Sequence, residues 1–154
     1  MIRINTISNN KGWYRYIKNP SNYIENKVDK INCKLKKYKK KKIFCTLLLS
    51  GDSEIKKLNK KFRNKNKPTD ILSFPFESKI KIKNQLYLGD IIISYNFMNK
   101  PKKQSLTLFK NKVIKTFIHG FLHLLGFDHI KLKDYKEMLR EEKKIYQSVI
   151  KKIN

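Results

Sequence analysis

Three histidines lie within one short segment of the chain, HGFLHLLGFDH, which runs from His119 to His129, and the protein has no others. Four residues advance a helix by about one turn, so His119 and His123 project from the same face and their rings can converge on one ion. Gly126 can adopt the left-handed conformation that ends a helix, which lets His129 supply a third nitrogen. The spacing therefore predicts a metal site.

The ligand types predict which chemistry this metal site supports. Three neutral imidazoles without a nearby thiolate suit zinc, although nickel, copper or iron would accept the same nitrogens. Three protein ligands leave a position for water, and zinc lowers the pKa of that water from about 15.7 to about 7. The bound water or hydroxide would then be a nucleophile for a phosphodiester or an amide. A structural zinc is the alternative, with Cys33 or Cys45 as fourth ligand.

One position within the histidine segment distinguishes hydrolysis of an amide from hydrolysis of a phosphodiester. The spacing coincides with the zinc-protease motif H-E-x-x-H-x-x-G-x-x-H, whose glutamate is the general base. Gly120 occupies the glutamate position here. Without that carboxylate, proton transfer to a leaving amine has no evident agent. The sequence therefore disfavours a zinc peptidase.

An arginine is the candidate for phosphate binding and catalysis. Arg63 is one of four arginines in a chain that otherwise uses lysine. Its planar guanidinium suits bidentate contact with a phosphate, and a cation stabilises the charge that builds during phosphoryl transfer. A surface arginine without a specific role is the alternative.

Composition limits the class of protein and its partners. The 154 residues fall within the size of a single domain, expected to span 1–154, and carry a net charge of +25. Such a field attracts polyanions such as RNA, although an AT-rich genome would also enrich lysine, isoleucine and asparagine. No apolar stretch is long enough to cross a membrane and no signal peptide is evident, so we expect a cytoplasmic protein.

Hydrophobic periodicity predicts a mixture of strands and helices. Helices are expected after Pro20, after Ser53, from Ser105 to Gly126, and over Asp134–Ile153. Strands are expected at Met1–Ile7, Ile43–Leu49, Thr69–Phe76 and Leu86–Ser94, with Pro75 marking an edge or an ending. This alternation favours an α+β fold in which helices pack against one small mixed sheet. The lysine-rich run 36–42 is expected to be a solvated turn, with direct RNA contact as the alternative.

Four ordered blocks resemble one known family, the YbeY family of bacterial endoribonucleases. They are Leu58-Asn59 with Phe62-Arg63, Pro68-Thr69-Asp70-Ile71-Leu72-Ser73-Phe74-Pro75, Leu88-Gly89-Asp90-Ile91, and the histidine segment. The resemblance covers about Leu47 to Tyr146. It implies a zincin-like fold related to the zinc proteases, metal binding by the three histidines, a functional Arg63, and action on small-subunit rRNA and in ribosome quality control. Phe127 stands where that family commonly has tyrosine.

Three hypotheses follow. The first is a metal-dependent, single-strand-specific endoribonuclease that acts on small-subunit rRNA in ribosome biogenesis. The second is a non-catalytic ribosome-assembly factor with a structural metal, and the third is a zinc peptidase. In each of them, Asp128 either orients a ligand ring as an acceptor or caps the turn before His129.

Overall fold

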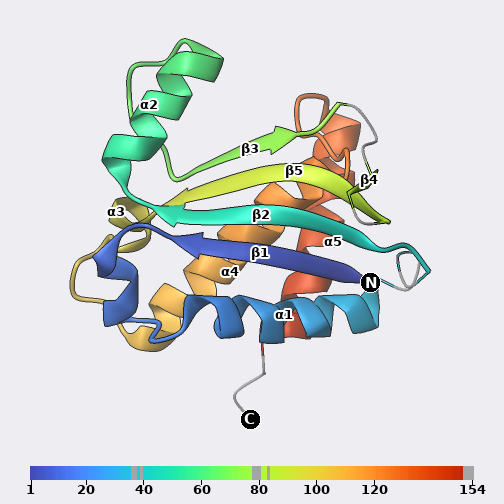
Figure 1. The fold of residues 1–154 in the computed structure, drawn as a ribbon, viewed down its shortest axis with the longest axis horizontal. Helices are drawn as coiled ribbons and strands as arrows, with labels where there is room; N and C mark the ends of the chain where they lie inside the picture. The colour runs from blue at the N-terminus through green and yellow to red at the C-terminus, as the bar shows by residue number, and fades with distance from the viewer. Residues whose placement is uncertain (36–37, 39, 78–80, 83, 151–154) are drawn as a thin grey trace.

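One mixed β-sheet organises the chain, with helices against both of its faces (Figure 1). The computed structural model describes residues 1–35, 38, 40–77, 81–82 and 84–150. Within them the strands are β1 (Ile2–Ser8), β2 (Ile43–Ser50), β3 (Ile71–Pro75), β4 (Lys81–Ile82) and β5 (Gln85–Ser94). Their spatial order is β1-β2-β5-β3, and β4 also pairs with β5. The pairs β1/β2 and β2/β5 are parallel, whereas β3 and β4 run antiparallel to β5.

The helices divide unequally between the two faces of the sheet. They are η1 (Lys11–Arg15), α1 (Pro20–Lys34), α2 (Asp52–Arg63), α3 (Tyr95–Met98), α4 (Leu106–Leu124) and α5 (Leu132–Val149). Helices α1, α4 and α5 form a layer against one face, here called the inner face. Helix α2 packs through Ile55 on the opposite, outer face, where it meets Leu72 and Ile92.

Buried and exposed side chains alternate along the strands, and the buried ones form the main core. In β1, Ile2 and Ile4 are buried and Arg3 is exposed, because successive side chains of a strand point to opposite faces. The inner-face side chains of β2 and β5 pack against α4, which contributes Phe117 and Phe121. Helix α4 is thereby held firmly across the sheet, and its last turns carry the histidine segment.

The structure confirms the α+β prediction and the four predicted strands, to within two residues at each end. Pro75 is the last residue of β3, which lies at an edge of the sheet, as predicted. The final helix begins at Leu132 rather than Asp134 and ends at Val149. The predicted helical Ile153 and three residues of the lysine-rich run, 36, 37 and 39, lie outside the described residues.

None of the helices in the described part of the chain is long and apolar enough to span a membrane.

Candidate metal centre and its cleft

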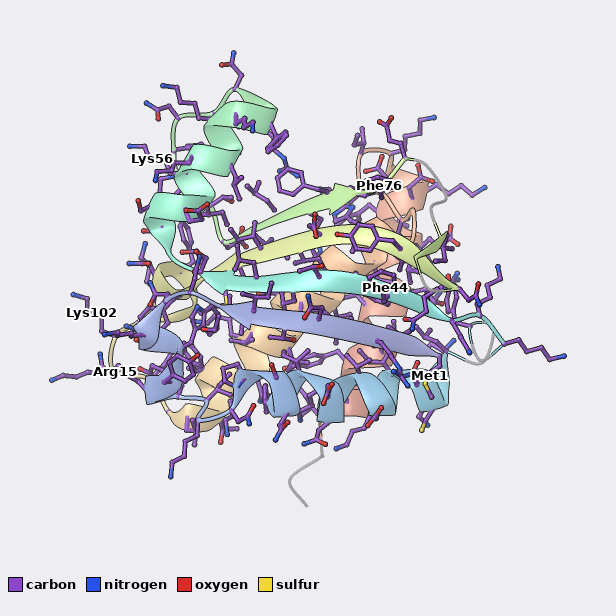
Figure 2. All side chains as sticks on the ribbon, viewed as in Figure 1. Met1, Arg15, Phe44, Lys56, Phe76 and Lys102 are labelled. Atoms are coloured by element: carbon purple, nitrogen blue, oxygen red, sulfur yellow. The ribbon has the colours of Figure 1, made fainter. Side chains whose placement is uncertain are left out.

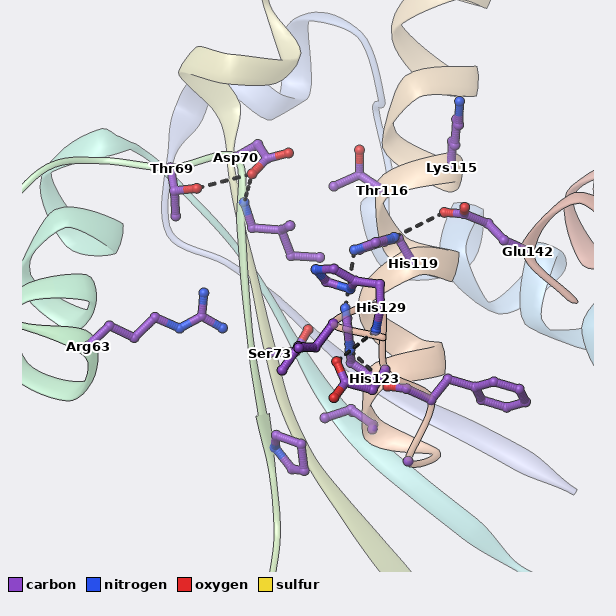
Figure 3. A pocket seen from close by; sticks show the side chains of 17 residues that line it. Arg63, Thr69, Asp70, Ser73, Lys115, Thr116, His119, His123, His129 and Glu142 are labelled. Carbon is purple, nitrogen blue, oxygen red and sulfur yellow. Dashed lines mark hydrogen bonds and ion pairs between the residues drawn. The ribbon is translucent and has the colours of Figure 1, made fainter. Parts of the chain in front are cut away.

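Helix α4 sets the positions of the first two histidines. The hydroxyl of Ser105 accepts a hydrogen bond from the backbone N–H of Leu108 at 3.1 Å and so caps the start of the helix. Helix α4 ends where Gly126 adopts a positive φ of 94°, the left-handed conformation expected from the sequence. The chain then reverses and brings His129 back beside His119 and His123 (Figure 3).

The three histidine rings converge on one point. Their candidate ligand atoms all lie within 4.8 Å of one another. The Nε2 atoms of His119 and His123 are 3.2 Å apart. Two zinc–nitrogen bonds of about 2.0–2.1 Å at a tetrahedral angle place their nitrogens about 3.3 Å apart, so this spacing fits a shared zinc-sized ion. These residues can therefore bind a metal ion.

Two acceptors orient the rings of His119 and His123 toward that point. The Nδ1–H group of His119 donates to the carboxylate of Glu142 on α5 at 3.2 Å. The Nδ1–H group of His123 donates to the backbone carbonyl of Phe127 at 3.0 Å. Because each Nδ1 is a donor, each Nε2 keeps its lone pair free for a metal. This contact uses the backbone of Phe127, so the orientation of the His123 ring does not depend on a phenolic hydroxyl at this position.

Asp128 has a different contact. Its carboxylate accepts a hydrogen bond from the backbone N–H of His129 at 2.7 Å, which holds the turn rather than a ligand ring. The acceptor for His119 is instead Glu142, a residue that the sequence analysis did not identify. Glu142 lies on another helix, and sequence spacing within one element cannot show that α5 packs there.

Burial favours the metal-binding form of one imidazole. The pKa of His123 is lowered, first by burial and then by the neighbouring His119, with a smaller lowering by His129. A lowered pKa keeps the ring neutral near pH 7, and neutral imidazole is the form that binds metal ions.

The two cysteines take no part in this arrangement. Among the described residues, the metal-ligand cluster consists of the three histidines alone. Cys45 is buried in β2, where burial raises the pKa of its thiol to about 12, and Cys33 is exposed on α1. These positions do not support a structural zinc closed by a cysteine.

The histidines open into a cleft of about 910 Å³ between α4 and the edge strand β3. Arg63, the last residue of α2, lines the opposite side, and Figure 3 shows its guanidinium directed toward the cleft. Asn64 ends α2 in the left-handed conformation, with φ of 55°, which turns the chain away from the helix axis immediately after Arg63. The structure thus brings the predicted cation and the predicted metal ligands to one cleft.

Further polar residues line the same cleft. Lys115 and Thr116 lie one helical turn before His119, a spacing that could have identified them from the sequence. Asp70 accepts hydrogen bonds from the hydroxyl of Thr69 at 3.1 Å and the backbone N–H of Ile71 at 2.9 Å. Asp70 therefore stabilises the chain where it enters β3.

Gly120 allows α4 and β3 to approach closely. A Cβ atom at this position would lie 2.5 Å from the Cδ1 of Ile71 and 2.8 Å from the hydroxyl oxygen of Ser73. Both contacts are shorter than Cβ atoms tolerate, and both neighbours line the cleft. A larger side chain at position 120, such as the zinc-protease glutamate, would therefore require the ends of the Ile71 and Ser73 side chains to shift.

The fold and the site together define the class of this protein. The protein has a zincin-like α+β fold: helices pack against a mixed sheet, two histidines lie one turn apart on α4, and a third follows a glycine turn, so that together they could hold a metal ion. The family model described as Endoribonuclease YbeY matches residues 8–150. The chain belongs to this family, which makes it an RNA-cleaving hydrolase.

Individual relatives agree with this assignment. The chain is 56% identical over 153 residues to the endoribonuclease YbeY of Pelagibacter ubique, covering 99% of each chain. It is 33% identical over 151 residues to that of a Wolbachia strain, covering 97% of this chain and 95% of the relative. The solution structure of TM1509 from Thermotoga maritima matches 97% of this chain and 89% of its own, with a TM-score of 0.60 at 29% identity. The family resemblance seen in the sequence is thus confirmed.

The contact between His119 and Glu142 leads to a prediction for metal affinity. Glu142→Ala should weaken zinc binding by roughly 10- to 100-fold, because it removes the acceptor that orients the His119 ring. Glu142→Gln should lose less zinc affinity than Glu142→Ala, since the amide oxygen of glutamine can still accept the hydrogen bond from His119. Competition with a chromophoric chelator measures both affinities.

Glu141→Ala is the matched control on the same helix, because the carboxylate of Glu141 pairs only loosely with Lys144 at 3.9 Å. Equal zinc affinities for Glu142→Ala and Glu141→Ala would show that Glu142 does not orient the ligand.

Proposed function

We propose that this chain is a zinc-dependent, single-strand-specific endoribonuclease that acts in small-subunit rRNA maturation, ribosome biogenesis and ribosome quality control. One observation carries the proposal: three converging imidazoles and one guanidinium line opposite sides of a single cleft. The names of the relatives support cleavage of RNA.

The residues of the cleft have separate roles in the proposed hydrolysis of a phosphodiester. His119, His123 and His129 would hold the ion. When bound there, zinc supplies Lewis acidity and lowers the pKa of water. Arg63 binds the scissile phosphate through its fork of N–H donors and stabilises the negative charge that develops on the transferring phosphoryl group. Lys115, exposed on the same wall, adds a second positive charge that attracts the RNA backbone.

The size of the cleft supports the preference for single strands. A volume of about 910 Å³ is comparable to the sites that enclose one small ligand, for which roughly 300–1,000 Å³ is typical. A space of this volume accommodates a few nucleotides of a single strand. The net charge of +25 contributes binding energy that does not depend on base sequence.

We infer further that residues 1–154 work as a single domain, because Arg63 on α2, His119 and His123 on α4, and His129 after the glycine turn line one cleft. Action in ribosome biogenesis assigns the protein to the cytoplasm, where ribosomes are assembled.

Removal and return of the metal test this proposal. We expect the zinc-loaded protein to cleave a single-stranded rRNA fragment, the chelator-stripped protein to lose that activity, and added zinc to restore it. Gel electrophoresis of the labelled fragment measures all three, and the same sequence annealed into a duplex should resist cleavage. A well-folded, zinc-loaded protein that binds the fragment without cutting it would instead favour a ribosome-assembly factor with a structural metal. Cleavage of casein would favour a peptidase.

A further inference from the structure

Among the residues that the structure describes, helices cover only part of the outer face of the sheet. Helix α2 packs over the end of this face that carries Leu48, Leu72 and Ile92. Toward the other end of the strands, where β1 and β2 begin, the outward side chains include several aromatic rings that remain partly accessible to solvent. Phe76, the most exposed of them, is 44% exposed.

These rings form one row across the sheet. Arg3 of β1 is the register partner of Phe44 in β2, and Phe44 is the register partner of Tyr87 in β5. The backbone N–H of Phe76 donates to the carbonyl of Leu88 at 2.8 Å, which continues the pairing of β3 with β5 and sets Phe76 next to Tyr87. Ring centroids are 4.9 Å apart for Phe44 and Tyr87, and 5.6 Å apart for Tyr87 and Phe76. We name Arg3, Phe44, Tyr87 and Phe76 the aromatic row.

Strand alternation shows that the aromatic row faces away from the core. Ile2 and Ile4, on either side of Arg3, are buried in the inner core. Leu86 and Leu88, on either side of Tyr87, pack against that same core. The side chains between them therefore point to the outer face. Figure 2 places Phe44 and Phe76 toward the end of the sheet that lies opposite Arg15.

The chemistry of the aromatic row fits single-stranded RNA. Exposed rings on a β-sheet stack on unpaired bases, and a neighbouring guanidinium binds phosphate. The hydroxyl of Tyr87 donates to Asp90, and burial, followed by this hydrogen bond, raises the pKa of Tyr87 to about 12. Arg3 is exposed and is one of only four arginines in the chain.

The aromatic row is continuous with the cleft. Pro75 lines the cleft, and the next residue, Phe76, begins the row. Arg63 also lines the cleft, and the adjacent Phe62 contacts Phe74 on the outer face, with ring centroids 5.1 Å apart. The Nζ of Lys61 lies 5.2 Å from the centroid of the Phe62 ring, so a positive charge accompanies these rings. A strand that leaves the cleft over the edge strand β3 can therefore reach Phe76.

We propose that the aromatic row is a second RNA-binding surface, on which the rings stack bases of the single strand that leaves the cleft and Arg3 binds a phosphate. The proposal rests on the RNA substrate proposed above and extends it from the scissile phosphate to flanking nucleotides. Positive charge at Arg3 and across the whole chain favours this polyanion over an apolar protein segment as the occupant.

Direct binding tests the proposal without cleavage. The probe is a fluorescein-labelled, 2′-O-methylated single-stranded RNA of about 12 nucleotides, within the range that such platforms span. Fluorescence anisotropy gives its dissociation constant from the zinc-loaded protein. Phe76→Leu keeps an apolar side chain but removes the ring, and we expect it to weaken binding about tenfold. For Arg3→Gln, we expect the slope of the logarithm of affinity against the logarithm of salt concentration to fall by about 0.7.

Matched controls come from the far end of the sheet. Tyr14, which is 49% exposed, and Arg15 offer an exposed ring and a guanidinium on η1. Tyr14→Leu and Arg15→Gln should keep wild-type affinity and salt dependence. Circular dichroism melting and zinc stoichiometry verify that each variant is folded.

Two outcomes would overturn the proposal: a folded Phe76→Leu protein that binds the probe like wild type, or an Arg3→Gln protein with an unchanged salt slope. The proposed endoribonuclease function can fail separately. A wild-type protein that binds the probe through the aromatic row but never cuts unmodified RNA would retain the second surface and lose the catalytic assignment.

Discussion

Replacing His123 by alanine is expected to abolish zinc-dependent RNA cleavage. The ring of His123 lies closest to both of the others: its centroid is 4.8 Å from that of His119 and 4.7 Å from that of His129, whereas those two are 5.6 Å apart. Loss of a direct ligand should reduce zinc affinity by more than the roughly 10- to 100-fold that loss of an orienting residue costs. Cleavage of the single-stranded rRNA fragment, together with zinc content after dialysis, measures the effect.

Thr107→Ala, at the exposed start of the same helix, is the control for changes to α4 that do not reach the cleft. Circular dichroism distinguishes loss of the metal from loss of the fold. If folded His123→Ala protein still processes rRNA at the wild-type rate, the metal is dispensable for function. That result would favour the assembly-factor hypothesis over the endoribonuclease. If the variant still cleaves purified RNA with a chelator present, the activity comes from a contaminating nuclease.

Arg63→Ala should reduce the cleavage rate by about 100- to 1,000-fold while zinc binding stays unchanged. Arg63 lies across the cleft from the histidines, so its removal takes away a cation at the phosphate but no metal ligand. Losing one preorganised donor to a developing negative charge typically costs this much in kcat. Arg63→Lys should recover only part of the rate, because lysine restores the charge without the planar fork. Single-turnover cleavage and zinc stoichiometry test both statements.

Arg15→Ala serves as the control, since Arg15 is an exposed arginine on η1 at the far end of the sheet from Phe44 and Phe76. A rate for Arg63→Ala within about twofold of the Arg15→Ala rate would exclude a catalytic role for the guanidinium, because one lost donor should cost far more.

Local rules were sufficient to predict the histidine centre. Helical spacing places His119 and His123 on one face, and a glycine at the helix end permits the turn to His129; the structure shows both. The same rules identified Pro75 as marking an edge strand. Each of these features depends on residues a few positions apart, so one segment contains all the information.

Features that join distant segments could not be predicted in this way. The contact between Glu142 and His119 requires α5 to pack beside α4, and the aromatic row requires the order β1-β2-β5-β3. Sheet order depends on pairings between segments far apart in the sequence, which periodicity does not encode. Arg63 was predicted only in part. The rarity of arginine in the chain identified it as a candidate, but only the fold shows that it lies across the cleft from the histidines.

The close approach at Gly120 also bears on how this lineage can evolve. A glutamate at position 120 would supply the general base of a zinc peptidase, and a codon change could introduce it. Its Cβ would lie 2.5 Å from the Cδ1 of Ile71 and 2.8 Å from the hydroxyl oxygen of Ser73, so the ends of these two side chains would have to shift. Those same two side chains form the wall of the cleft. Gaining the peptidase base would therefore change the shape of the nucleic-acid cleft at the same step, because the two side chains that must move both line it.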